Sequence, residues 1–180
     1  MRAKLWFLGL GLIASLLVGA YPYQLSLWEP PPTVIVSSHA GVYSENPEFH
    51  SRIISSLWIL YLMPGISDWW RIVDSYQVEF RENEACPGVM CAYYHKIGTR
   101  VYSTVGVRPS ATFSPNFGAA MMIHELMHIA DMSRGCWDPP SLEYRASITS
   151  WHEAKKLNLT PGEQEWLDYL LVKSPGPDKC

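Results

Sequence analysis

Residues 114–135 read SPNFGAAMMIHELMHIADMSRG, and they predict a helix at the centre of the fold. Ser114 is the expected N-cap, Pro115 suits the first helical position, and Gly135 follows the last turn. An apolar sequence on nearly every side of a helix is typical of one that is buried in a domain. Between Phe117 and Met132 only four residues are polar, and these are His124, Glu125, His128 and Asp131.

The four polar residues of this helix include a pattern with a known chemistry. His124 and His128 are four residues apart and so share one face of the helix, with Glu125 beside them. Buried imidazoles and carboxylates need partners, and a divalent cation is one partner for the group. This spacing is typical of zinc hydrolases, in which two histidines bind the metal and the glutamate is the general base. We predict that His124 and His128 bind Zn²⁺ and that Glu125 is catalytic, the alternative being two ordinary core histidines.

A catalytic zinc site takes three protein ligands and leaves the fourth position to water, so one more ligand is required. Glu143 is the first candidate, because it lies one loop downstream, early in the next expected helix. Glu153 and Asp138 are the second and third candidates. A third histidine at a short fixed distance is excluded, since it would need glycine at position 131 and histidine at position 134, where the chain has other residues.

Residues 95–155 as a whole resemble the gluzincin metallopeptidases. The resemblance is carried by the pentapeptide 124–128, by the strand-rich segment before it and by Glu143-Tyr144-Arg145-Ala146 after it. It implies a zincin-like active-site helix, Glu143 as the third zinc ligand, and hydrolysis of peptide bonds in a peptide or protein substrate. It also implies that an extended substrate adds to the edge of the sheet, here expected around residues 100–105. The chain lacks the large second lobe of the thermolysin-like members, so no substrate preference follows.

Three further residues are expected to support this chemistry. Asp131 is similar to the acidic residue that some gluzincins carry after the motif, and it is expected to orient a histidine ligand through the other ring nitrogen, with a solvated helix charge as the alternative. Tyr144 and His152 are candidates for stabilising the oxyanion.

The first twenty residues predict where such a site works. Met1-Arg2-Ala3-Lys4 is basic, residues 5–18 are apolar, and small residues follow at 19 and 20, which together are typical of a secretory signal peptide. The alternative is a membrane anchor through residues 5–20. Residues 21–33 contain three consecutive prolines and predict a stiff spacer. We therefore expect a secreted or periplasmic protein, with an N-terminal membrane tether if the segment is not cleaved.

The remaining residues, 34–180, suffice for one metallopeptidase domain with its own core. The formal net charge of the whole chain is −3, and removing Arg2 and Lys4 makes it more negative. Nucleic acid is therefore not an expected partner.

The periodicity of the apolar residues predicts an α+β domain. A helix capped by Asn46 runs to about Tyr61, with His50 and Arg52 facing solvent. Strand patterns near 34–36, 76–81 and 92–105 predict a small antiparallel sheet. The helix 114–135 follows. Two C-terminal helices come after it, the first capped by either Asp138 or Ser141 and the second by Thr160. The predicted fold is thus a small sheet packed with the active-site helix and C-terminal helices.

All four cysteines lie after the export signal, which favours disulfides. Cys86 and Cys91 flank a Pro-Gly turn and are expected to pair, which leaves Cys136 for Cys180. The competing interpretation is a thiolate zinc site.

The rival to an enzyme is a zinc-binding protein of the cell envelope that cleaves nothing. Glu125 argues against it, because a structural zinc site is closed by four ligands and needs no carboxylate between the histidines.

Overall fold

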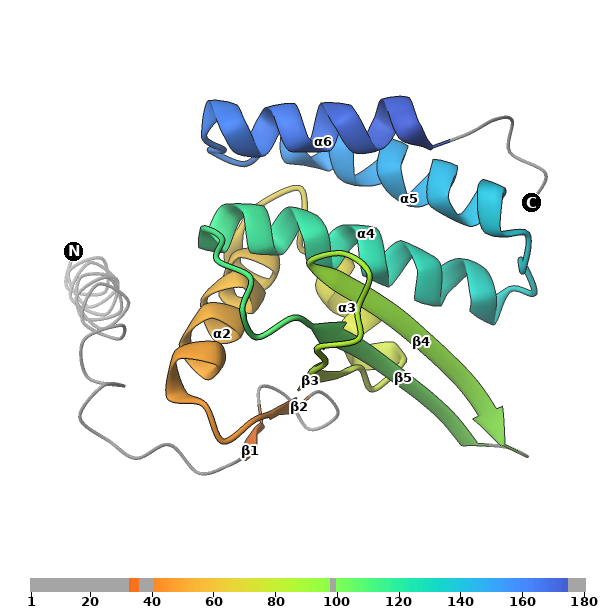
Figure 1. The fold of residues 1–180 in the computed structure, drawn as a ribbon. Helices are drawn as coiled ribbons and strands as arrows, with labels where there is room; N and C mark the ends of the chain where they lie inside the picture. The colour runs from red at the N-terminus through yellow and green to blue at the C-terminus, as the bar shows by residue number, and fades with distance from the viewer. Residues whose placement is uncertain (1–32, 36–40, 98–99, 175–180) are drawn as a thin grey trace, which may run out of the picture. The chain divides into compact units, whose positions relative to one another are not determined.

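The computed structural model describes residues 33–35, 41–97 and 100–174 of the 180-residue chain. Five strands and five helices lie within these ranges (Figure 1), and in chain order they are β1 (Thr33–Ile35), β2 (Gly41–Tyr43), α2 (Pro47–Leu62), α3 (Asp68–Ser75), β3 (Glu79–Glu82), β4 (Met90–Ile97), β5 (Arg100–Val107), α4 (Pro115–Ser133), α5 (Pro139–Ala154) and α6 (Pro161–Lys173). The predicted α+β class is confirmed. The strand β2 and the helix α3 were not predicted.

The five strands form one sheet in the order β1-β2-β3-β5-β4. Two of its four pairings, β2 with β3 and β3 with β5, are parallel, so the sheet is mixed and the expected antiparallel sheet is wrong. The reason lies in the connections. The helices α2 and α3 form the crossover that parallel strands need between β2 and β3. The strands β4 and β5 form a hairpin, and its second strand pairs with β3.

This strand order places β4 at the edge of the sheet. The expectation that the edge lies around residues 100–105 is therefore wrong, since β5 lies between β3 and β4. Sequence pattern describes each strand of a hairpin equally well, and only the pairing with β3 decides which one is outermost.

The helices begin where their caps were predicted. Asn46, Ser114 and Thr160 each accept a hydrogen bond from the first turn, and Thr160 forms the full capping box with Glu163. Asp138 rather than Ser141 caps α5. Glu163 also accepts a hydrogen bond of 3.2 Å from the backbone N–H of Ser114, so one carboxylate links the starts of α4 and α6.

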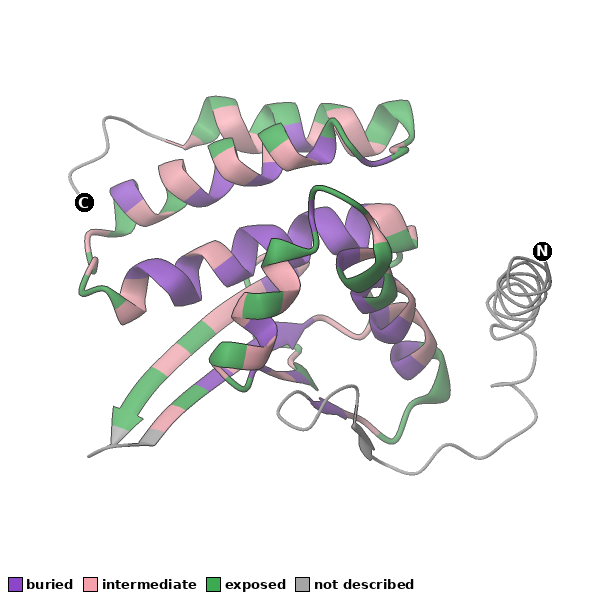
Figure 2. Cartoon of the chain, turned by 180° about the vertical axis from the view of Figure 1, so that it is seen from behind, coloured by how far each residue is buried: buried purple, intermediate pink, exposed green. Residues whose placement is uncertain are grey.

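The helix α4 is the centre of the core, and Figure 2 shows it buried along most of its length. It packs against α2 on one side and α5 on another, and β4 crosses it. The approach to α2 is close at Gly118, where an added Cβ atom would lie 2.1 Å from the Ser56 hydroxyl oxygen. Glycine at this position therefore sets the spacing of the two helices.

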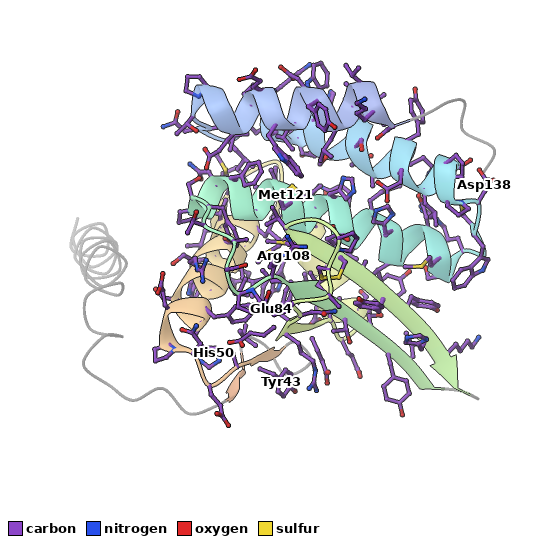
Figure 3. The ribbon with its side chains drawn as sticks, in the orientation of Figure 1. Tyr43, His50, Glu84, Arg108, Met121 and Asp138 are labelled. Atoms are coloured by element: carbon purple, nitrogen blue, oxygen red, sulfur yellow. A yellow bond between two sulfur atoms is a disulfide. The ribbon has the colours of Figure 1, made fainter. Side chains whose placement is uncertain are left out.

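Two residues of α2 correct the sequence analysis. His50, labelled in Figure 3, is buried rather than solvent-facing, and neither ring nitrogen has a hydrogen-bond partner in the described part of the chain. Burial lowers the pKa of His50, although the charge of Glu82 acts in the opposite direction. Arg52 donates hydrogen bonds to the backbone oxygens of Pro109, at 3.0 Å, and Ala111. His50 is thus part of the interior, and Arg52 holds the loop before α4 through hydrogen bonds.

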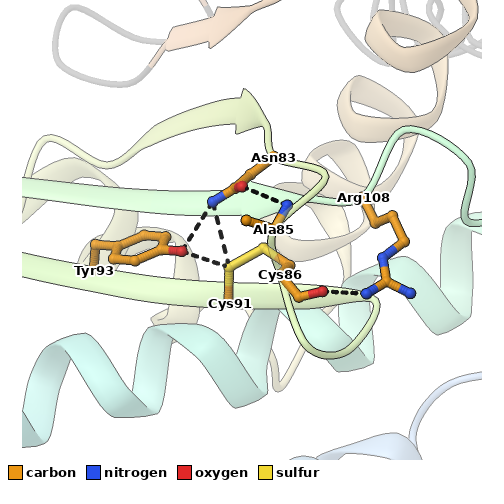
Figure 4. Close-up of a disulfide and its surroundings, with 6 residues drawn as sticks. All are labelled: Asn83, Ala85, Cys86, Cys91, Tyr93 and Arg108. Atoms are coloured by element: carbon orange, nitrogen blue, oxygen red, sulfur yellow. Dashed lines mark hydrogen bonds between the residues drawn. A yellow bond between two sulfur atoms is a disulfide. The ribbon is translucent and has the colours of Figure 1, made fainter.

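Cys86 and Cys91 form the predicted disulfide, with 5.5 Å between their Cα atoms. Figure 4 shows its surroundings. The side-chain amide of Asn83 donates to the Tyr93 hydroxyl at 2.9 Å, and Arg108 donates to the backbone oxygen of Cys86. The bridge closes the turn that leads into β4. The other predicted pair includes Cys180, which lies outside the described residues.

The predicted signal peptide, residues 1–20, and the spacer up to residue 32 also lie outside the described residues, so these remain predictions. Among the helices that are described, none combines the length and the apolarity needed to cross a bilayer.

Candidate metal centre

The helix α4 brings three of the predicted site residues to one place. His124, Glu125 and His128 are all buried, and the two imidazole rings lie 4.8 Å apart between centroids. Their neighbours along the helix are apolar and belong to the hydrophobic core. Burying polar groups in such surroundings destabilises the fold unless they have partners. Partners for these three side chains are therefore expected on a neighbouring element.

The helix α5 supplies the fourth residue. The chain reverses direction between α4 and α5, with Gly135 at a φ of 89° and Asp138 as the N-cap of α5. The reversal returns Glu143 to the two histidines. Its Oε2 atom lies 3.5 Å from Nε2 of His124, and its Oε1 atom lies 3.5 Å from Nε2 of His128.

These distances fit a metal ion between the three side chains. One ligand atom from each of His124, His128 and Glu143 lies within 4.8 Å of the others. Donor atoms about 2.1 Å from a tetrahedral ion lie about 3.4 Å apart, close to the observed nitrogen–oxygen distances of 3.5 Å. A separation of 3.5 Å is long for a direct hydrogen bond. The donor set of two imidazoles and one carboxylate is thus arranged around a centre and could hold a metal ion.

The pKa values of the buried groups in this cluster are shifted from their usual values. Burial raises the pKa of Glu125 to about 7. Burial opposes protonation of His124, but the nearby carboxylates of Glu143 and Glu125 outweigh this effect and raise its pKa. Burial and the charge on His124 together lower the pKa of His128 to about 4. A bound metal ion would be stabilised by the carboxylates of this buried group, and its binding would release any proton that the ligand atoms hold.

The backbone of the edge strand β4 contacts Glu125. The N–H of Ala92 donates a hydrogen bond to the Glu125 carboxylate, which opposes the rise in its pKa caused by burial. The role of Ala92 was not predicted, and no sequence signal indicates it, because any residue except proline offers the same backbone donor.

A cavity of about 480 Å³ contains the cluster. Glu125 and the three metal-ligand candidates are the charged or titratable side chains that line it, and the other lining residues are apolar or small. Its walls are formed by the turn that the disulfide closes, by the first residues of β4, and by the helices α4, α5 and α6. The other lining residues are Pro87, Gly88, Val89, Met90, Cys91, Ala92, Met121, Met132, Pro139, Leu142, Trp166 and Leu170. The sequence analysis did not foresee the walls made by 87–89 and α6.

The other two candidates for the third ligand are engaged elsewhere. Glu153 pairs with Lys156 at 2.6 Å. Asp138 accepts hydrogen bonds from the backbone N–H and the hydroxyl of Ser141, at 3.1 and 2.6 Å. Tyr144 and His152, the oxyanion candidates, are not among the residues that line the cavity.

Asp131 does not orient a histidine as the resemblance implied. Its buried carboxylate accepts two hydrogen bonds from Arg145, Nε–Oδ2 at 2.8 Å and Nη2–Oδ1 at 3.2 Å, and a further one from Arg134. Nδ1 of His124 is buried, and no group of the described chain hydrogen-bonds to it. The ion pair between Asp131 and Arg145 instead links α4 to α5, and Arg145 is two residues from Glu143.

We expect Arg145→Ala to lower the free energy of unfolding by about 3 kcal/mol, because it leaves most of a buried carboxylate without its partner. Arg134→Ala should cost less than about 1 kcal/mol, since the Arg134 side chain is 60% exposed against 27% for Arg145. Urea unfolding of the two metal-free variants measures both changes. Equal losses would contradict the role given to Arg145.

Comparison of the chain with models of protein families, with curated proteins and with solved structures finds no match. The function must therefore be argued from the site itself.

Proposed function

We propose that the protein is an exported zinc metallopeptidase that resembles the gluzincins. The observation that carries the proposal is the convergence of His124, His128 and Glu143 on one point, with Glu125 beside them in an apolar cavity. No fourth protein ligand belongs to this group among the described residues. Three ligands and a cavity are the arrangement of a catalytic zinc site, whereas structural zinc is enclosed by four.

The donor set favours zinc, because two imidazoles and a carboxylate are a common ligand set for catalytic Zn²⁺. Bound zinc would lower the pKa of water to about 7 and polarise a carbonyl group. His124 and His128 would hold the metal through their Nε2 atoms, and Glu143 would hold it through a carboxylate oxygen. The Asp131–Arg145 ion pair keeps α5, and with it Glu143, in position.

Glu125 would move the proton. Its buried carboxylate lies beside the histidines that would hold the metal and lines the cavity, so it is placed to accept and return a proton. The Ala92 N–H donates a hydrogen bond to this carboxylate, and Glu125 lines the cavity. Glu125 would accept a proton from the attacking water and then deliver it to the nitrogen of the leaving amine.

The substrate is proposed to be a peptide in extended conformation. The edge strand β4 has no partner strand on its outer side within the described residues, and its start lines the cavity. An extended peptide can add to such an edge through main-chain hydrogen bonds. A substrate that fills the cavity would displace water from its apolar walls, including those from α6.

Export follows from the N-terminal pattern and agrees with the disulfide between Cys86 and Cys91, which is stable in an oxidising compartment. The substrates would then be proteins or peptides outside the cytoplasm.

We expect purified protein to contain one zinc ion per chain and to lose it on treatment with a strong chelator, because the proposed ligand set is complete with a single ion. Metal analysis by mass spectrometry, before and after chelation, measures this. A zinc content near zero after expression with added zinc would contradict both the metal site and the enzyme.

A further inference from the structure

We propose that Trp137 and Tyr94 form a subsite that binds a large apolar side chain of the substrate, two residues from the bond that is cleaved. The inference rests on the proposed peptidase function and adds a determinant of specificity to it.

The hydrogen-bonding pattern shows which residues of β4 face outward. Val89 and Arg108 form a hydrogen-bonded pair, with the Arg108 N–H donating to the Val89 oxygen at 2.9 Å. The oxygen of Val107, opposite Met90, accepts from Asn83 on the other side of β5. Since pairs alternate along antiparallel strands, Met90, Ala92 and Tyr94 direct their backbone groups to the free edge. The Ala92 N–H that donates to Glu125 fits this pattern.

Tyr94 therefore offers its N–H and its C=O to an added strand. It lies two residues beyond Ala92, about 7 Å farther along the edge. A peptide that pairs with β4 and presents a bond beside Glu125 would have its backbone held by Tyr94 two residues away. The side chain of the peptide residue that pairs with Tyr94 would contact the residues around Tyr94.

Trp137 is the neighbour of Tyr94 at this place. The two ring centroids are 6.3 Å apart, with the ring planes tilted by 53°. Trp137 belongs to the loop that joins α4 to α5, and both helices line the cavity, as do Met132 and Pro139 on either side of the loop. Asp138, next to Trp137, lies beyond the end of α4 that is far from Met121 (Figure 3). The loop thus connects two parts of the cavity wall and carries Trp137 beside Tyr94 of the edge strand.

The chemistry of this place selects an apolar side chain. The Trp137 residue is 58% exposed, although a large aromatic surface is costly to leave in water. The charged groups beside it are already paired, Arg134 with Asp131 and Asp138 with Ser141. A leucine, phenylalanine or similar side chain would cover the exposed ring and bury apolar area on both partners.

The experiment uses the zinc-loaded full-length protein and a library of random-sequence decapeptides, with the cleaved bonds identified by mass spectrometry. The parent protein should enrich large apolar residues at one position two residues from the cleaved bond. Trp137→Ala should lose this enrichment and cleave a selected decapeptide about tenfold less efficiently, with unchanged zinc content. A truncated peptide lacking that position should be cleaved equally by both proteins. Trp137→Phe should retain the preference.

The matched control is Trp58→Ala, which removes another exposed tryptophan, 44% exposed, on α2, a helix that contributes no residue to the cavity wall. It should leave the preference and the cleavage rate unchanged. A binding measurement separates recognition from chemistry: the selected decapeptide should bind Glu125→Gln about tenfold more tightly than it binds the double variant with Trp137→Ala. If the parent protein cleaves the library but Trp137→Ala shows the same preference, the subsite is overturned alone. If the parent cleaves no peptide and Glu125→Gln binds none, the proposed function is overturned as well.

Discussion

Replacing Glu125 by Gln is expected to lower peptide hydrolysis by about a thousandfold while the protein keeps one zinc ion per chain. The substitution keeps the size of the side chain and removes only its ability to accept a proton, and general-base catalysis contributes about 10²- to 10⁴-fold to a rate. Ala92 is the backbone donor to this side chain, and the amide oxygen of Gln can still accept its hydrogen bond. Initial rates on a fluorogenic peptide and metal analysis of the same preparation give the two readouts.

Two comparisons make this result specific. His124→Ala should lose both zinc and activity, because it removes a ligand rather than the base. Thermal unfolding of Glu125→Gln should match the parent or exceed it, since a neutral amide is less costly to bury than a carboxylate. Full activity in Glu125→Gln would show that another group accepts the proton, and the proposed mechanism would be wrong.

The parts of the fold that local sequence determines were predictable. A helix cap is a contact between residues three apart, so Ser114, Asn46 and Thr160 could be identified from their neighbours alone. The same holds for the turn that joins Cys86 to Cys91. The spacing of His124 and His128 is also local, because four residues of α-helix place two side chains on one face.

The parts that depend on distant contacts were not. Whether β4 or β5 forms the edge depends on the partner that β3 selects, and both strands have the same alternating pattern. The spacing of the apolar residues of α2 does not determine whether His50 faces the core or the solvent. In the folded protein the packing of α2 buries it. Asp131 was expected to serve a histidine, but Arg145 reaches it from the next helix. The direction in which α5 packs against α4 determines that Arg145 is the partner of Asp131.

The position of Glu143 relative to the two histidines depends on the loop between α4 and α5 rather than on a fixed spacing. The structure brings its two carboxylate oxygens to 3.5 Å from the two imidazole nitrogens. We therefore expect Glu143→Ala to weaken zinc binding by more than about a hundredfold, because it removes a ligand and a carboxylate that lies 3.5 Å from both imidazole nitrogens. Competition with a chromophoric chelator measures the affinity.

Glu153→Ala is the matched control for this prediction. Glu153 is the same residue type on the same helix, but its carboxylate pairs with Lys156 at 2.6 Å and is not part of the cluster. Its removal should leave the zinc affinity within about twofold of the parent, as expected for a charge that is not a ligand. Glu143→Gln separates charge from geometry, since a neutral amide oxygen is a weaker ligand of the same shape and should give an intermediate affinity. If Glu143→Ala bound zinc as tightly as Glu153→Ala, the two histidines would have a different third partner, and the gluzincin resemblance would rest on residues 124–128 alone.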